Sequence, residues 1–502
     1  MILRLFPQRP DHPLADGKEL KRILGELHVE RPANAIEEVT SWIESLRQAP
    51  DFRVDFYLDV LRQLDEVAQP HLRHLLRDYF QARISPVERQ RLWTLCHGYW
   101  REASAGYALA VDGARLAPAG RAGDALRALL PIAATRLQGA RCARVKWLAY
   151  RHEMPDEDFW RSLGQTYLAA EQSAYSAKPT PLYPGQQGLT SVAQQTVSAV
   201  VFSISATDRL PPLQVELADR LITHCLPGFA LLPGWRPECV YWIDTASGVA
   251  PVRLAVQPGP PRPSLRFLSS APACAALGEL IRLLEHGELP PGINLGGQYP
   301  ARVILPVARH LAEYWNPTPP RRRHQRHAVR TRMAVIVGFE ASYAIFSANP
   351  PRPPDYAGTH SWVVENVSLG GFLAIREEIG PDTIGIGSLL CMQAEGGDNW
   401  LLGRVQRLVR APGGPSRVGI QVLSRHAQSV ELRPRRSGFA AALPGIWLRE
   451  AVERGVLRIV LPADGFKVRE SMDLGLPERT RVLTPLDLES TGSDYEIGRF
   501  RE

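Results

Sequence analysis

The sequence predicts an α+β protein of several domains. At 502 residues the chain is too long for one hydrophobic core, since domains hold roughly 150 residues each. Apolar residues recur at helical spacing early in the chain and fall into short strand-like runs late in it. The predicted divisions are a helical domain at 1–230, a mixed α/β segment at 231–315, an arginine-rich switch linker at 316–332, a six-stranded antiparallel β-barrel at 333–430 and a C-terminal β extension at 431–502.

The composition is that of a globular protein, with 45% hydrophobic and 22% charged residues. A net charge of +7 permits binding to phosphates, but 59 basic against 52 acidic residues is a mild excess. Whether phosphate binding is expected therefore depends on local clusters of basic residues. The first residues lack a secretory pattern, and no run is apolar enough to span a bilayer. We therefore expect a cytoplasmic protein without a membrane span.

The six cysteines are scattered without a CxxC pair, and several lie in apolar surroundings. Buried free thiols are therefore expected, in preference to a disulfide framework or a metal site. No carboxylate pair, nucleophile elbow, phosphate-binding loop or HExxH motif is evident, so neither catalytic residues nor a metal are predicted.

In the first 230 residues, helices are expected between the breaks at Pro70 and Pro86, and another at the acidic run that follows Pro155. The spacing Trp160-x2-Leu163-Gly164-x2-Tyr167 matches the first helix of a tetratricopeptide repeat. No second copy follows at the period of roughly 34 residues that stacked repeats require. These apolar side chains are therefore interpreted as core.

The middle of the chain changes character. ECVYWIDT and SLRFLSS favour strands, and two amphipathic helices are expected at 275–285 and 301–315. The following NPTPPRRRHQRH favours an extended backbone, because prolines restrict it and the uncompensated charge resists packing. This run marks the clearest boundary in the sequence.

Beyond the boundary, alternating patterns and Gly-Gly turns favour a small barrel. Its strands are expected at 333–339, 361–365, 371–376, 388–393, 401–409 and 416–423. The last piece is expected to begin with a short helix in GIWLREAVERG and to return to strands in VLRIVLPA and RTRVLTPLDLES, completing or extending the barrel.

Two motifs in this region carry chemistry. Arginines recur at a spacing of four, as Arg322 with Arg326 or as Arg326 with Arg330, just before the first barrel strand. Guanidinium forks bind phosphate oxygens or guanine O6 and N7 bidentately, which lysine cannot do. Downstream, Asn366 and Ser368 point to one side of an extended backbone, and the glycines that end at Gly371 allow a tight turn.

The order of arginine pair, strand, Asn-x-Ser-x2-Gly and the late strand VGIQVLS resembles the PilZ domain family over residues 320–430. The resemblance implies a barrel that binds the bacterial second messenger cyclic di-GMP. The site residues that it implies are Arg322, Arg323, Arg326, Arg330, Asn366, Ser368 and Gly371. The proline-rich insertion SANPPRPPDYAGTHS makes the distance between the two motifs longer than the family's pattern.

The resulting hypothesis is a cyclic di-GMP-binding regulatory protein that is not an enzyme. Ligand binding would order the arginine-rich segment, and the helical N-terminal region would contact a protein partner. Two alternatives come from other classes: a PilZ-like scaffold that binds a partner without nucleotide, and a basic nucleic-acid-binding protein. Because the two motifs occur together, we do not expect nucleic acid as the partner.

Overall fold

A computed structural model describes residues 11–49, 52–81, 83–185, 188–290, 299–318, 324–347, 359–377, 384–411, 414–435, 441–450, 453–475 and 480–502. The chain folds into two compact units. The first comprises Met1–Thr207 with Pro212–Pro320, and the second Asp208–Pro211 with Arg321–Glu502.

The first unit begins with the expected helical region. Prolines and capping side chains start its helices: the Ser85 hydroxyl accepts a hydrogen bond from the Glu88 amide at 3.1 Å, and the Asp156 carboxylate one from Phe159 at 2.7 Å. Pro70 does not break the chain as expected but lies inside a helix. The helices are α1 (Gly17–Val29), α2 (Pro32–Gln48), α3 (Val54–Tyr79), α4 (Pro86–Arg115), α5 (Arg121–Arg127), α6 (Leu130–Ala149), α7 (Glu157–Gln172), α8 (Val192–Ile204) and α9 (Pro212–Cys225).

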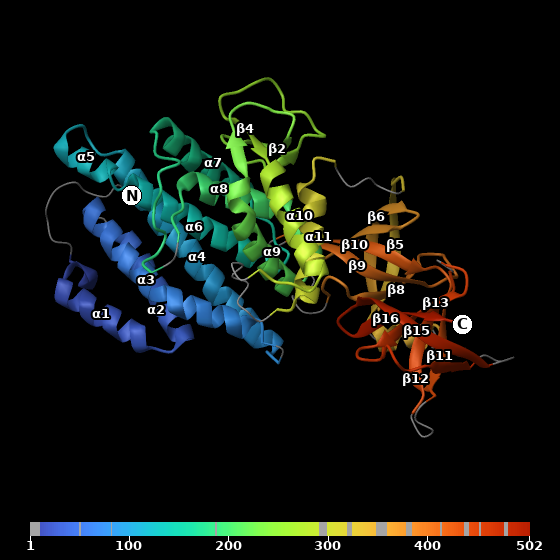
Figure 1. Cartoon of the computed structure of the whole chain (residues 1–502). Coiled ribbons are helices and arrows are strands. Elements are labelled where there is room, and N and C mark those ends of the chain that lie inside the picture. The colour runs from blue at the N-terminus through green and yellow to red at the C-terminus, as the bar shows by residue number, and fades with distance from the viewer. Residues whose placement is uncertain are drawn as a thin grey trace. The chain divides into compact units, whose positions relative to one another are not determined.

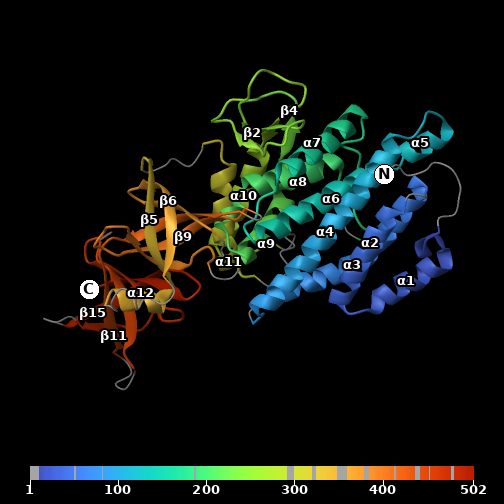
Figure 2. The ribbon, with the colours of Figure 1, turned by 180° about the vertical axis from the view of Figure 1, so that it is seen from behind.

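A buried polar network ties α3, α4 and α6 together, and these helices lie side by side in Figures 1 and 2. The Asp65 carboxylate, only 1% exposed, accepts hydrogen bonds from the Tyr99 hydroxyl at 2.5 Å and the Tyr107 hydroxyl at 2.7 Å, and from the Arg136 guanidinium at 3.0 Å. Burial, and then the Asp65 charge, raise the pKa of both tyrosines well above its usual value, so they donate as neutral phenols. A desolvated carboxylate is tolerated here because several donors satisfy it.

The middle segment packs against this helical region in the same unit. Its sheet has the order β1-β4-β2-β3, with β1 (Ala230–Leu232), β2 (Cys239–Asp244), β3 (Val252–Arg253) and β4 (Leu265–Ser269). Both expected helices are present, as α10 (Ala271–Glu285) and α11 (Ala301–Trp315).

Helix α7 carries the repeat-like segment, and its apolar side chains are core as interpreted, with Trp160 3% and Leu163 0% exposed. The glycine of the segment, Gly164, has a role different from that in a repeat. A Cβ there would lie 2.2 Å from the carbonyl oxygen of Thr245, so the small residue allows the backbone after β2, not a partner helix, to approach.

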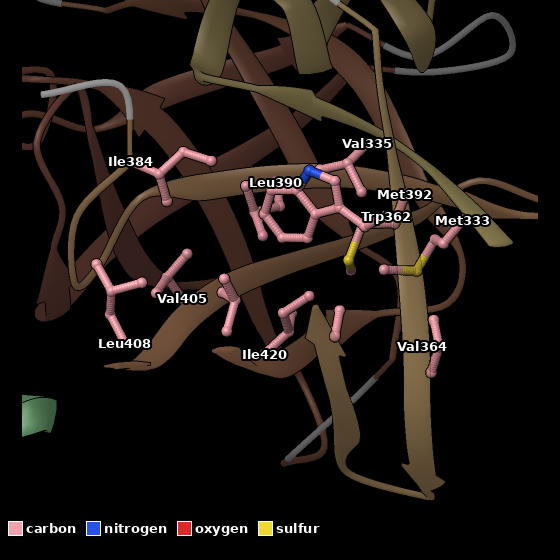
Figure 3. Packing of buried hydrophobic residues seen from close by; sticks show 12 residues of the cluster. Met333, Val335, Trp362, Val364, Ile384, Leu390, Met392, Val405, Leu408 and Ile420 are labelled. Carbon is pink, nitrogen blue, oxygen red and sulfur yellow. The ribbon is translucent and has the colours of Figure 1, made fainter. Parts of the chain in front are cut away.

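The second unit holds the expected six-stranded antiparallel barrel. Its strands are β5 (His327–Val337), β6 (His360–Ser368), β7 (Gly371–Arg376), β8 (Leu389–Ala394), β9 (Leu401–Val409) and β10 (Ser416–Ser424), and the short helix α12 (Phe339–Ile345) follows β5. Five strands match the expected runs closely, but β5 begins at His327, inside the expected linker, and ends at Val337. The barrel interior is apolar, and Figure 3 shows the fully buried Trp362 lying among Val335, Leu390 and Met392.

The expected β extension is a second closed barrel. It contains β11 (Ala427–Pro434), β12 (Leu443–Leu448), β13 (Val456–Pro462), β14 (Met472–Gly475), β15 (Thr480–Thr491) and β16 (Tyr495–Arg501). The short helix expected in GIWLREAVERG is wrong, because Leu443–Leu448 pairs as a strand with β11. Here the pairing of Ile446 and Leu448 into a buried core overrides local helix propensity.

The two barrels share one strand order. Numbered along the chain, the strands of each barrel follow one another around it as first, second, third, sixth, fifth and fourth. The first barrel reads β5-β6-β7-β10-β9-β8, and the second β11-β12-β13-β16-β15-β14. Equivalent positions in the two barrels can therefore be compared directly.

In the part of the chain that the structure describes, no helix combines the length and the apolar character that crossing a bilayer requires. Nor do three or more His, Cys, Asp or Glu side chains of these residues gather where they could hold a metal ion. All six cysteines are free thiols. Burial raises the pKa of both Cys142 and Cys225 to about 12, which keeps these thiols protonated.

Replacing Asp65 by alanine is expected to destabilise the helical unit by about 3–5 kcal/mol, because the Arg136 guanidinium would stay buried with less compensation. Chemical denaturation, followed by far-ultraviolet circular dichroism, measures the free energy of unfolding of the wild type and the variant. Asp59→Ala, at an exposed position of the same helix, is the control and is expected to change stability by less than about 0.5 kcal/mol. Equal effects of the two substitutions would contradict a structural role for the network.

Candidate nucleotide-binding site

The backbone pairing of the first barrel brings the two sequence motifs to one edge. At the start of β5, His327 pairs with Val367 and Ala328 pairs with Asn366. Arg326 immediately precedes this strand and is exposed. The arginine-rich segment therefore enters the barrel beside the Asn-x-Ser-x2-Gly turn.

A β-bulge directs Asn366 away from the core. Trp362 and Val364 point into the barrel, and simple alternation would send Asn366 inward after them. Val364 pairs with Ala374, however, whereas Asn366 pairs with the adjacent Leu373, so Glu365 is an extra residue between them. Because Ala374 belongs to the core and Leu373 alternates with it, Asn366 lies on the outer face together with Ser368.

This outer face continues across two more strands. Leu373 pairs with Gly419, and Gly371 pairs with Gln421. Gln421 alternates with the buried Ile420, and its side-chain oxygen accepts a hydrogen bond from Arg404 Nε at 2.9 Å. Asn366, Ser368, Gln421 and Arg404 thus supply hydrogen-bonding groups on one face of β6, β7, β10 and β9. Such a face can bind base edges and phosphate oxygens.

The turn between β6 and β7 is held tightly. The Ser368 hydroxyl donates to the carbonyl oxygen of Gly371 at 3.2 Å, and the Val422 amide donates to that of Gly370 at 3.0 Å. A Cβ at Gly371 would lie 1.9 Å from the carbonyl oxygen of Ile420. The glycine at the end of the motif is therefore required by the close approach of β10.

The arginine-rich segment also contacts this turn directly. The His324 ring lies against Gly370, where its Cδ2 is 3.2 Å from the position that a Cβ would take. A side chain at residue 370 would thus push the segment away from the turn. His324 and the turn therefore lie side by side at this edge of the barrel.

A further arginine, not predicted from the sequence, lies at the same turn. Arg425, in the connection between β10 and β11, donates from Nη2 to the carbonyl oxygen of Leu369 at 2.9 Å. The Glu450 carboxylate fixes this connection by accepting hydrogen bonds from the Arg425 amide, from the His426 amide at 3.1 Å and from the Ser424 hydroxyl. Partial burial acts to raise the pKa of Glu450, but these hydrogen bonds outweigh it and hold that pKa below its usual value.

Of the residues that the sequence implied, Arg322 and Arg323 lie outside the described residues. The structure brings Arg326, Asn366, Ser368 and Gly371 to one edge of the barrel. Arg330 is exposed on β5, at the bulge between Ala328 and Thr331. Which two arginines form the binding pair stays a prediction.

Arg404, Gln421 and Arg425 were not predicted. The family-like strand VGIQVLS pointed to β10, but nothing in its sequence showed that Gln421 shares the outer face with Ser368. Arg425 reaches the turn only through the tertiary fold, although its position directly after a predicted barrel strand was a usable signal.

Comparison with known families gives a match that lies outside the barrel. Residues 18–234 match the family described as "Cyclic-di-GMP receptor FimW, N-terminal domain". This range covers the helical region, whereas the PilZ resemblance covers residues 320–430. No curated protein and no solved structure matches the chain.

Replacing Gly371 by alanine is expected to open the β7–β10 pairing at a cost of about 1–3 kcal/mol, because the added methyl group overlaps the Ile420 carbonyl. The opening of this pairing would appear as a loss of hydrogen-exchange protection at the β7 and β10 amides. Gly385→Ala is the control, since no atom lies within 4 Å of its added Cβ. Unchanged protection in Gly371→Ala would show that the close approach is not needed.

Glu450→Gln is expected to loosen the β10–β11 connection near neutral pH. The folded-state pKa of Glu450 is lowered, so its contribution to stability is present above the unfolded-state pKa and is lost as the pH falls through the folded-state value. Hydrogen exchange of the Arg425 and His426 amides should therefore differ between wild type and variant at pH 7 and converge in acid. A difference that persists in acid would contradict a role for the carboxylate charge.

Proposed function

We propose that this chain is a cyclic di-GMP effector whose ligand site is the outer face of the first barrel. The observation that carries the proposal is the pairing of Ala328 with Asn366, which sets the arginine-rich segment beside the polar turn. Arg326 and the neighbouring arginines would bind phosphates or guanine edges. Asn366 and Ser368 would fix the orientation of the dinucleotide.

The match of residues 18–234 supports this proposal from a separate part of the chain. The matched family is described as the N-terminal domain of a cyclic di-GMP receptor, and the motif residues lie outside the matched range. The helical region and the barrel motifs thus support the same proposed ligand by separate arguments.

We also propose that the protein acts by binding and not by catalysis. The boundary between the two compact units falls at Pro320 and Arg321, at the arginine-rich segment. Closing this segment over a ligand would change the connection between the units and so the surface offered to a protein partner. The helical region is the proposed partner-binding part.

Calorimetric titration of the full chain with cyclic di-GMP tests the proposal. We expect the wild type to bind, and Arg326→Ala and Ser368→Ala each to weaken binding by about tenfold or more, because each removes a hydrogen-bonding group from the ligand. Arg322→Ala and Arg330→Ala identify the arginine that acts with Arg326, since the true partner should show the larger loss.

Arg469→Ala is the control, because Arg469 is an exposed arginine in the connection between β13 and β14 of the second barrel. Arg469→Ala lowers the net charge by the same amount as the arginine substitutions at the site, and it should leave the affinity unchanged. Cyclic di-AMP tests base recognition, since it carries the phosphates without the guanine O6 acceptor. The proposal fails if the wild type does not bind cyclic di-GMP, or if the site and control variants bind equally.

A further inference from the structure

The second barrel repeats the architecture of the first at the position of the ligand site. In both barrels the residues just before the first strand lie against those that follow the second strand. In the first barrel His324 contacts Gly370, after β6. In the second barrel the Arg425 and His426 amides bind Glu450, after β12.

The chemistry at these equivalent positions differs. The first barrel presents an arginine-rich segment without a single acidic residue between Arg321 and Arg332. The second barrel has its own carboxylate there, and its charge is satisfied by backbone amides and the Ser424 hydroxyl. An added phosphate would be repelled by Glu450 and would find these donors occupied. This position of the second barrel is therefore unsuited to an anionic ligand.

The same contacts hold an arginine at the first barrel's turn. Only Arg425 and His426 separate the end of β10 from the start of β11, so the connection has little freedom. Arg425 is exposed, and its Nη2 is positioned by the Leu369 carbonyl oxygen at 2.9 Å. A side chain fixed in this way loses little conformational entropy when it binds a ligand.

We infer that Arg425 is a further cyclic di-GMP-binding residue, contributed by the connection between the barrels and held in place by Glu450 of the second barrel. The inference rests on the proposed function. Its guanidinium contacts a phosphate of the dinucleotide bound at the Ser368–Gly371 turn, with N–H groups that the Leu369 carbonyl does not use. The second barrel thus serves as the support of the ligand site in the first.

The test compares the cyclic di-GMP affinity of the full chain for the wild type and for Arg425→Gln, over a range of salt concentrations. Glutamine removes the charge and keeps a polar amide group, although its side chain is two bonds shorter than the path to arginine Nη2. We expect affinity to fall by about tenfold and its dependence on salt to become shallower, because one cation no longer meets the phosphate. Arg425→Lys keeps the charge but not the fork, so it should retain the salt dependence with a smaller loss of affinity.

Arg469→Gln is the matched control and should leave affinity and salt dependence unchanged, since Arg469 is exposed in the connection between β13 and β14 and is not part of the proposed site. Hydrogen exchange of the free proteins checks that the turn keeps its protection. If Arg425→Gln does not fold, Arg425→Lys decides: a partial loss of affinity with the wild-type salt dependence and unchanged protection of the turn supports the contact, and wild-type affinity overturns it.

The possible failures are distinct. If the wild type does not bind, the proposed function is wrong. If the wild type binds and Ser368→Ala weakens binding, but Arg425→Gln behaves as Arg469→Gln does, only the role of Arg425 is wrong. A loss of affinity in Arg425→Gln with an unchanged salt dependence would also overturn the phosphate contact, since it would show an effect on turn shape alone.

Discussion

The site depends on backbone pairing between the start of β5 and the end of β6. This pairing fixes where the arginine-rich segment enters the barrel, and the bulge at Glu365 fixes which side of the sheet Asn366 faces. A one-residue slip of register would turn Asn366 toward Trp362 and the apolar interior, so the same hydrogen bonds set the register and the face on which Asn366 lies.

The barrel strands were predictable because their patterns are local. Alternation around Trp362 and Val364, and glycines at the turns, marked the strands without knowledge of the fold. The helix predicted in GIWLREAVERG was wrong because Glu450 and its neighbours favour a helix locally, whereas the buried Ile446 is paired across a sheet that only the folded chain creates. Closure of the last strands into a second barrel depends on such non-local pairs and left no local signal.

The candidate site was partly predictable for the same reason. Asn366, Ser368 and Gly371 form a contiguous motif, and their placement follows from one hairpin. The contact of Arg425 with Leu369 spans a large sequence separation and is set by the end of β10. Gly371 illustrates a further difference: its motif position indicated a turn near a ligand, and the structure shows that the neighbouring strand imposes the same residue. The close approach of β10 alone therefore accounts for glycine at this position.

The two-residue connection between the barrels has an evolutionary consequence. The connection consists only of the bends at Arg425 and His426, so an inserted residue would disturb the contact of the Arg425 guanidinium with Leu369 or those of the Arg425 and His426 amides with Glu450. The length of this connection should therefore be under stronger selection than the surface composition of either barrel. Sequences that drift freely elsewhere in the second barrel would still keep the spacing from Ser424 to Ala427.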